Sequence, residues 1–443
     1  MRKIVAKAMF LTYVCVMAWK FSAPQTTRAA VVGGRRGDHL RLVVILSRHG
    51  IRSSTWTQER LDGYSALPWP KWSVPPGDLT SRGYEQMKQF GSYDRTVLSQ
   101  AGLFKADGCV DASKTYIWAD TDQRTQASGK AFAEAFFPGC PPPVHGLAIG
   151  ERDPVFHSRV NEVGQATTGV ASAQAARRAE PQTSAVQREL IEEMQHVLQG
   201  CAPKVACTPE RAPELPLLGA RVAPVRGVDD RMADSQSPLA LASSFAEDLL
   251  LEYSDGMPMD QVGWGKVDEP QLRKFLTLHT EYFEQTHRSP AQARLESSTM
   301  LSQIARTLQQ AVEQRPVTGA IGPANTKLVF LAGHDSNIAG VAALLGVHWS
   351  LDGRRDDTPP GTELAFELWQ DERGAYSVRV TVAMQTLLQM REMQVLTPAT
   401  PPANATLAMR GCDVREDECP WAGFRRIAKL ATDANAVRSV HPN

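Results

Sequence analysis

Three short, largely apolar stretches stand out along the chain, at residues 42–47, 114–119 and 327–332. They are rich in β-branched and aromatic residues and show no alternation, which is typical of strands buried on both faces of a sheet. A polar segment and then apolar residues at helical spacing follow each one. Strand, polar loop and helix, repeated three times, predict an α/β fold with a mixed, mainly parallel sheet sandwiched by helices.

The helices after these strands have recognisable starts. Thr80 and Thr121 are suited to cap the first two, and Asp335 or Ser336 the third. The side-chain oxygens of such residues accept hydrogen bonds from the free N–H groups of the first turn. Gly346 is suited to end the third helix.

The middle of the chain has a different pattern. Between Ser184 and Gly200, apolar residues recur every three or four positions, as on one face of a helix. Residues 238–253, 271–284 and 291–313 also have helical character. This region therefore predicts a group of helices rather than further strands.

We predict a mostly helical second domain at residues 144–320, inserted into an α/β domain made of residues 31–143 and 321–443. Near the end of the chain, residues 363–370 and 376–385 alternate between apolar and polar positions around a short polar turn. They predict a β-hairpin at the edge of the sheet.

The chain has 443 residues, with 48 Lys+Arg and 48 Asp+Glu, so its formal net charge is zero. That balance argues against general electrostatic binding to nucleic acid or to an anionic membrane. Any anionic ligand must instead be held by a local group of cations. The sequence leaves the oligomeric state open, and a monomer is the working expectation.

Residues 1–30 have the pattern of a secretory signal peptide, with basic residues, a short apolar stretch and then small residues. An uncleaved anchor is the alternative, but Thr12 and Lys20 leave no apolar run of the length that spans a membrane. We therefore expect export to the periplasm or secretion, with no membrane attachment after cleavage.

Seven cysteines are present, and Cys15 lies in the predicted signal peptide. The other six form three pairs that are close in sequence: Cys109 and Cys140, Cys201 and Cys207, Cys412 and Cys419. Sequence alone permits several pairings, and nearest-neighbour disulfides are the simplest in an oxidising compartment. A zinc site is the alternative, but no CxxC pair or cysteine–histidine cluster at metal-binding spacing is present.

Charged residues and histidines follow each predicted strand. They are Arg48, His49 and Arg52 after the first, Arg124 after the second, and His334 and Asp335 after the third. Guanidinium groups match phosphate oxygens, a histidine can attack phosphorus, and an acid beside a histidine can supply a proton. Taken singly, each loop could be an ordinary polar turn, with Arg124 paired to Asp120 or Asp122. Because the carboxyl ends of parallel strands share one edge, the pooled residues favour phosphoryl transfer.

With these residues in place, the chain resembles the histidine acid phosphatases, most closely the bacterial periplasmic phytase and glucose-1-phosphatase branch. The resemblance rests on LSRHGIR, ADTDQRT and AGHDSNIA, together with GMPMDQVGWG at 256–265 and DTPPGTELAFELW at 357–369. It implies an exported acid phosphatase that hydrolyses small phosphate monoesters through a phosphohistidine, either as a phytase or as a glucose-1-phosphatase or other sugar-phosphate phosphatase.

Two alternative functions are compatible with the same fold. A non-catalytic phosphate-ester binding protein would be expected to lack His49 or Asp335, and both are present. A phosphomutase is opposed by the predicted export and by the His334–Asp335 pair.

The resemblance also implies roles for individual residues. His49 matches the family nucleophile and Asp335 the acid that protonates the leaving oxygen. The residues that match the phosphate-binding groups are Arg48, Arg52, Thr55, Arg124 and His334. No metal or other cofactor is implied. Trp56 and Glu247 are candidate cleft residues, and a solvated carboxylate on a helix is the alternative for Glu247.

Three positions depart from the family pattern. Ser54 stands where a proline is usual, Trp56 where close phytases carry a lysine, and Glu296 where a further cation is expected. The last two changes remove positive charge from the rim that would meet a highly phosphorylated substrate, although Trp56 could stack on a sugar or aromatic leaving group. The remaining histidines, His157 among them, lack a second ligand-type residue at helical or hairpin spacing and are interpreted as structural.

Overall fold

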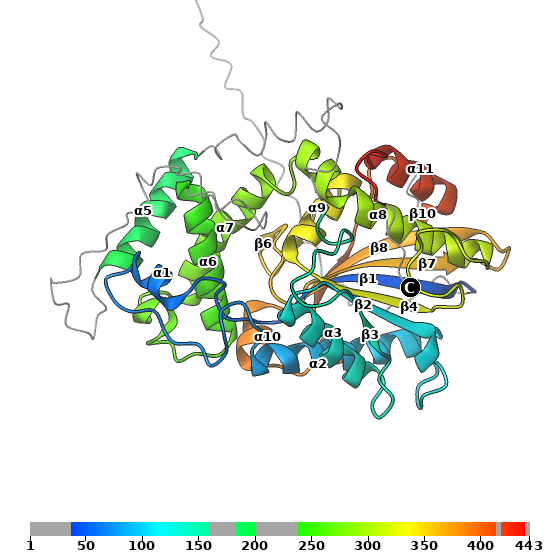
Figure 1. Ribbon diagram of the computed structural model, residues 1–443, viewed down its shortest axis with the longest axis horizontal. Helices are drawn as coiled ribbons and strands as arrows, with labels where there is room; N and C mark the ends of the chain where they lie inside the picture. The colour runs from blue at the N-terminus through cyan, green and yellow to red at the C-terminus, as the bar shows by residue number, and fades with distance from the viewer. Residues whose placement is uncertain (1–36, 159–182, 201–236, 413–417, 439–443) are drawn as a thin grey trace, which may run out of the picture.

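The computed structural model describes residues 37–158, 183–200, 237–412 and 418–438. A mixed sheet forms its centre, with the strand order β10-β8-β7-β1-β4-β2-β3 and β9 on β8 (Figure 1). The parallel half consists of β1 (His39–Arg48), β4 (Leu328–Gly333), β2 (Thr115–Ala119) and β3 (Val144–His145). Three of these are the strands that the uninterrupted apolar stretches predict.

The other half of the sheet is antiparallel. It contains β7 (Glu363–Gln370), β8 (Tyr376–Met384), β9 (Ala403–Thr406) and β10 (Cys419–Pro420). The predicted hairpin is β7 and β8, and β7 pairs directly with β1. Its expected place at the edge was wrong, because the short strands β9 and β10 both pair with β8.

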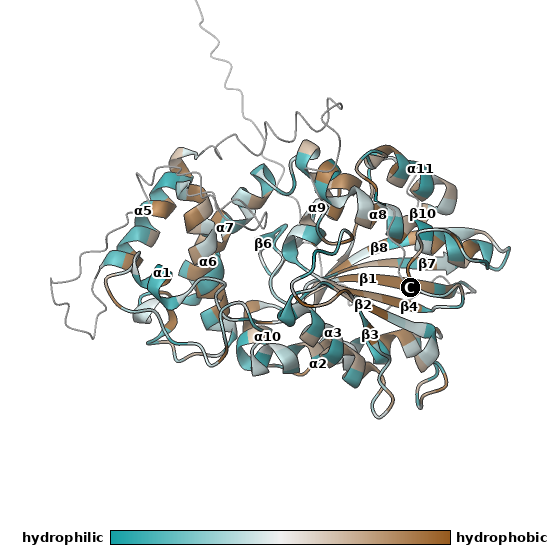
Figure 2. Cartoon of the chain, viewed as in Figure 1, coloured by the Kyte–Doolittle hydropathy of each residue, from teal (hydrophilic) through white to brown (hydrophobic). Residues whose placement is uncertain are grey.

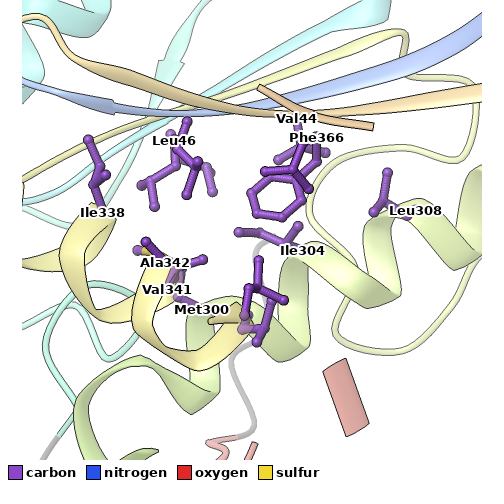
Figure 3. Close-up of a cluster of buried hydrophobic side chains, with 14 of the residues drawn as sticks. Val44, Leu46, Met300, Ile304, Leu308, Ile338, Val341, Ala342 and Phe366 are labelled. Carbon is purple, nitrogen blue, oxygen red and sulfur yellow. The ribbon is translucent and has the colours of Figure 1, made fainter. Parts of the chain in front are cut away.

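Helices cover both faces of the sheet (Figure 1). Apolar side chains on one face pack against α2 (Ser81–Gln100) and α3 (Gln123–Phe136). The other face packs against α8 (Pro290–Glu313), α9 (Asp335–Leu345) and α11 (Trp421–Ala431). Figure 3 shows Val44 and Phe366 of the sheet opposite Ile304 of α8 and Val341 of α9. The central strands are hydrophobic along most of their length, as expected for a sheet buried on both faces (Figure 2).

A separate helical lobe has its own apolar core. It consists of α5 (Ala185–Gln199), α6 (Pro238–Ser254) and α7 (Glu269–Gln285), joined by α1 (Gln58–Asp62) and α10 (Leu387–Glu392). Within the predicted insertion at residues 144–320, α5, α6 and α7 form the lobe. By contrast, β3 lies in the sheet and α8 packs on the sheet. The division of the chain at residues 144 and 320 stays a prediction.

The helix starts are partly as predicted. Thr80 caps α2 by accepting from the Gly83 N–H, and Gly346 ends α9 with φ 63°. The cap of α3 is Asp122 rather than Thr121, whose hydroxyl donates to a backbone carbonyl instead. The predicted cap of α9 at Asp335 or Ser336 was also wrong. His334 occupies the cap position, because the side chain of Asn337 accepts from its backbone N–H at 2.9 Å.

Two of the predicted disulfides are confirmed, Cys109–Cys140 and Cys412–Cys419. Cys201, Cys207 and the predicted signal peptide at residues 1–30 lie outside the described residues. Within the described ranges, none of the helices has both the length and the apolar character needed to cross a bilayer.

Candidate active site

The three polar loops meet because their strands are neighbours. β4 lies between β1 and β2, so the carboxyl ends of the three strands are adjacent. His49, just after β1, donates its backbone N–H to Gly333 at 3.0 Å, and Asp120, just after β2, donates to Ala332 at 3.0 Å. α6 of the helical lobe closes this edge of the sheet, since its Glu247 contacts Arg48 at the end of β1.

His49 is held in one tautomer. Its Nδ1 lies 2.8 Å from the Gly50 carbonyl oxygen, which can only accept, so Nδ1 carries the proton and Nε2 has a free lone pair. The side chain is buried. Burial lowers the pKa of His49 well below its ordinary value, and the cations Arg124, Arg48 and Arg52 lower it further. The imidazole therefore stays neutral, as a nucleophile requires.

Gly50 has a packing role. A Cβ on Gly50 would lie 2.5 Å from the Gly83 carbonyl oxygen of α2. A glycine here therefore lets the loop lie directly against α2.

Glu247 holds the two arginines of the first loop. Its Oε1 accepts from Nη2 of Arg48 and lies 3.5 Å from Nη2 of Arg52. All three side chains are buried. Burial alone would raise the pKa of Glu247, but the arginines outweigh it, so the pKa lies below its ordinary value. The alternative of a solvated carboxylate is thereby excluded, and the charge on Glu247 fixes both guanidinium groups at the site.

Arg124 approaches from the second loop. Its Nη2 lies 2.7 Å from Oδ2 of Asp122, so the ion pair considered from the sequence is present. Its Nη1 donates to the Gly77 carbonyl at 3.4 Å, and the Gly77 N–H donates to Ser54 at 2.8 Å. Gly77 thus connects Arg124 to the loop that carries the exposed Thr55. Burial lowers the pKa of Arg124 to about 10, which leaves it cationic.

Asp335 lies beside Arg48. Its Oδ2 is 3.1 Å from Nη2 of Arg48, and its Oδ1 accepts from the Ser336 N–H at 2.7 Å. Burial raises the pKa of Asp335, but Arg48, His279 and other cations outweigh it and hold the pKa below its ordinary value. In the absence of substrate the side chain is therefore an ionised carboxylate.

His334 is buried and shares a carboxylate with a second histidine. Nε2 of His334 and Nε2 of His157 each lie 2.6 Å from the same Oδ2 of Asp120. The His334 and His49 rings are 5.6 Å apart between centroids. Burial lowers the pKa of His334, while Asp120 opposes that effect. His157 has no ligand-type residue at helical or hairpin spacing in the sequence, and it is chain folding that brings it to Asp120.

Trp56, a candidate cleft residue from the sequence, packs among other side chains. Its ring contacts Tyr64 and Phe245 of the helical lobe, with centroids 5.8 and 5.5 Å away. The Arg60 guanidinium carbon lies 3.6 Å from the centre of the Trp56 ring. A cation is therefore present above the aromatic residue that replaces the family lysine.

Ser54 and Glu296, the other two positions that differ from the family pattern, also have side-chain partners. Ser54 is buried, accepts from the Trp56 N–H at 3.2 Å and hydrogen-bonds Asp248 of α6. These hydrogen bonds fix the loop at Ser54, the position at which the family pattern has a proline. The Glu296 carboxylate accepts from Gln292 at 2.6 Å and lies 3.2 Å from Nδ1 of His287.

The structure thus brings together Arg48, His49, Arg52, Arg124, His334, Asp335 and Glu247. The sequence missed Asp120 and His157 as partners of His334, and Arg60 as a cation over Trp56. Only Asp120 had a usable signal, as an acid at the carboxyl end of a buried strand.

Known proteins resemble this chain over most of its length. Residues 39–383 match the sequence model of the histidine phosphatase superfamily (branch 2). The chain is 32% identical over 416 residues to the phytase AppA of Escherichia coli (strain K12), covering 92% of this chain and 95% of that protein. It is 29% identical over 404 residues to the glucose-1-phosphatase of Salmonella typhimurium, covering 89% and 93%.

Solved structures extend the likeness to three dimensions. The phytase of Hafnia alvei in complex with myo-inositol hexakis sulphate superposes with a TM-score of 0.78 and 31% identity, covering 91% of this chain and 100% of that one. The phytase of Citrobacter braakii has a TM-score of 0.73 and 28% identity, covering 90% and 99%.

Proposed function

Because this chain belongs to the histidine phosphatase superfamily (branch 2), it is a hydrolase of phosphate monoesters, and we propose that it works through a phosphohistidine at His49. One observation carries the choice of nucleophile. The Gly50 carbonyl holds the proton on Nδ1, so the lone pair of Nε2 is free among three arginines.

In the first half-reaction, Nε2 of His49 attacks phosphorus and forms an N–P bond while the bond to the ester oxygen breaks. Asp335 gives its proton to the departing oxygen, which leaves as an alcohol. In the second half, water attacks the phosphohistidine, Asp335 takes the proton of that water, and the N–P bond breaks to release phosphate. The charges balance, because the proton that Asp335 gives up in the first half-reaction is returned to it in the second.

The arginines supply electrostatic stabilisation. Arg48, Arg52 and Arg124 would surround the transferring phosphoryl group, whose charge spreads over its equatorial oxygens in the transition state. The N-terminus of α9, which begins at Asp335, adds backbone N–H groups and the positive end of a helix dipole. Glu247 keeps Arg48 and Arg52 in position before substrate arrives.

We propose a highly phosphorylated inositol as the preferred substrate. Similarity to phytases in sequence and in structure supports this choice. The Arg60 guanidinium over Trp56 also supports a highly phosphorylated substrate. Arg60 supplies a positive charge beside residue 56, where the sequence alone had suggested that the charge of the family lysine was lost. Glucose-1-phosphate is the second candidate, favoured by an aromatic rather than a lysine side chain at residue 56 and by the Salmonella relative.

Export to the periplasm is part of the proposal. The pattern of residues 1–30 supports it, and so do the disulfides Cys109–Cys140 and Cys412–Cys419, which are typical of proteins in oxidising compartments.

The nucleophile is tested with His49→Ala. We expect hydrolysis of p-nitrophenyl phosphate to fall to the background rate while the circular dichroism spectrum stays that of the wild type, because His49 lies in a loop beyond the strand. Alkaline quenching of the wild type during turnover, which preserves the acid-labile N–P bond, should trap a phosphorylated peptide that contains His49. A folded variant with near wild-type turnover would refute the assignment.

The substrate is tested by comparing kcat/KM for phytate, glucose-1-phosphate, p-nitrophenyl phosphate and a nucleotide. We expect phytate to be preferred. The variant Arg60→Gln should lower kcat/KM for phytate more than for p-nitrophenyl phosphate, which does not extend to the rim. A clear preference for glucose-1-phosphate, unaffected by Arg60→Gln, would favour the second candidate.

A further inference from the structure

Three atoms that commonly bind metal ions meet beside the proposed phosphate site. Nε2 of His157, Nε2 of His334 and a carboxylate oxygen of Asp120 all lie within 4.8 Å of one another. They come from three separate segments: the loop before α5, the cap of α9 and the end of β2. Their meeting is therefore a product of the fold and not of a local turn.

The hydrogen bonding of Asp120 is incomplete in this arrangement. Its side chain is fully buried, with 0% exposure. Oδ2 is shared between the two imidazoles, while Oδ1 has no hydrogen-bond partner in the part of the chain that the structure describes. Arg124, a nearby cation, makes its ion pair with Asp122. A buried polar atom without a partner calls for an explanation, and a bound ion is one.

A second cluster with similar donors provides a contrast. Glu284, His348 and Asp356 also place ligand atoms close together. There, however, the Arg288 guanidinium already lies 2.9 Å from Glu284 and 2.9 Å from Nδ1 of His348. A cation thus occupies the place that a metal ion would take. None of the contacts described for Asp120 places a guanidinium group between Asp120 and the two histidines.

We propose that His157, Asp120 and His334 bind a divalent transition-metal ion such as Zn²⁺, and that this ion inhibits the enzyme. Two imidazoles and a carboxylate are suitable ligands for Zn²⁺. In a tetrahedral site, nitrogen and oxygen ligands stand about 3.3 Å apart, so the imidazoles must withdraw slightly from Asp120. The His157 side chain is 35% exposed, which permits that movement and gives the ion a path from solvent.

The inhibition rests on the proposed function and on the role that the family resemblance implies for His334, which is to hold the phosphate. A Zn²⁺ ion on Nε2 of His334 replaces the proton of that nitrogen, which is released to solvent. In the structure this N–H donates to Asp120, and phosphate binding requires it to turn to a phosphate oxygen. A zinc-bound Nε2 has no proton to donate there. Occupancy of the site and productive binding of phosphate therefore exclude each other.

The test is a calorimetric titration of the tag-free, phosphate-free enzyme with Zn²⁺ alone. It is run at about pH 7.5, above the ordinary imidazole pKa of roughly 6.5, because metal binding requires neutral imidazoles. The variants are His157→Gln, which keeps an N–H donor for Asp120, and the matched control His348→Gln from the second cluster. Thermal unfolding of each variant shows whether it is folded. In parallel, the inhibition of p-nitrophenyl phosphate hydrolysis by Zn²⁺ is measured relative to the metal-free rate of each variant.

We expect the wild type and His348→Gln to bind about one equivalent of Zn²⁺, and His157→Gln to bind it at least about tenfold more weakly. The inhibition constant for Zn²⁺ should rise by a similar factor in His157→Gln only. Equal affinities in all three proteins, an equal loss in the two variants, or binding without inhibition would overturn the proposal. An enzyme with no activity on phosphate esters would instead contradict the proposed function, while the titration would still report on the site.

Discussion

Asp335 is the residue whose environment must change most during the proposed reaction. Without substrate it is ion-paired with Arg48, which helps to keep its pKa below the ordinary value. A bound phosphate dianion would take up the donors of Arg48 and add negative charge, and both effects raise the pKa of Asp335. The proton that the leaving group needs is thus retained only in acid, which predicts an acidic optimum.

Asp335→Asn separates proton donation from positioning. We expect kcat for glucose-1-phosphate or phytate, whose alcohol leaving groups need a proton, to fall by about 100-fold or more. The loss for p-nitrophenyl phosphate should be much smaller, because its phenolate leaves without a proton. Both kcat values are measured across pH. Equal losses with an unchanged pH profile would leave Asp335 as a positioning residue only.

Glu247 acts on the reaction through Arg48 and Arg52. Glu247→Gln keeps the size of the side chain but removes the charge, so the arginines lose their common partner. We expect kcat/KM to fall by roughly tenfold to 100-fold, the cost of a charge-assisted hydrogen bond.

The matched control for this variant is Glu252→Gln on the same helix. Glu252 is buried, accepts from the Gly263 N–H at 3.0 Å, and burial raises its pKa well above the ordinary value. In acid it is therefore neutral, as glutamine is, and kcat/KM should stay at the wild-type level. A similar loss in both variants would mean that α6 is disturbed as a whole.

At the scale of elements, a pair of buried carboxyl groups joins α2 to the sheet. Asp94 of α2 and Glu363 of β7 are hydrogen-bonded to each other away from solvent. Burial raises the pKa of Asp94 to about 8 and that of Glu363 well above its ordinary value. The contact between helix and strand is therefore made by protonated groups, which suits a protein that works in acid.

This pair predicts a stability that declines with rising pH. An unfolded chain releases the Asp94 proton near pH 3.9, whereas the folded chain keeps it up to about pH 8. The contribution to stability is therefore complete below about pH 4 and is lost as pH rises toward 8. Asp94→Asn does not titrate, so its free energy of unfolding relative to wild type should improve by about 1 kcal/mol or more between pH 5 and pH 7.5.

The measurement for Asp94→Asn is denaturant unfolding at the two pH values. Asp107→Asn, at an exposed position, serves as the control. A difference from wild type that does not change with pH would show that the pair does not share protons in this way.

At the scale of the whole molecule, the disulfides close loops on the α/β part of the chain. Cys109–Cys140 spans 31 residues and encloses β2 and α3, while Cys412–Cys419 spans 7 residues and leads into α11. A longer loop removes more conformational freedom from the unfolded chain, so the first bond should contribute more to stability.

Peptide mapping of the exported protein without reduction should recover Cys109–Cys140 and Cys412–Cys419, and also the predicted Cys201–Cys207. Cys109→Ser together with Cys140→Ser should lower the melting temperature more than the corresponding pair of substitutions at Cys412 and Cys419. Recovery of crossed pairings, or of free thiols, would contradict the disulfide scheme.

The sequence by itself determined the local elements and the chemistry of the loops. Uninterrupted apolar stretches specify strands buried on both faces, so the ends of β1, β2 and β4 could be predicted to within three residues. Parallel strands between helices must bring their carboxyl ends to one edge. That rule alone was enough to collect His49, Arg124 and Asp335 into one candidate site.

Only the tertiary structure decided which side chains contact one another. Arg48 meets Glu247 across 199 residues of sequence, and His334 meets Asp120 across 214. It also decided that α8 packs on the sheet instead of in the helical lobe. The periodicity of a sequence reports which face of an element is apolar. It does not report which other apolar face will cover it, because that depends on how all the elements pack together.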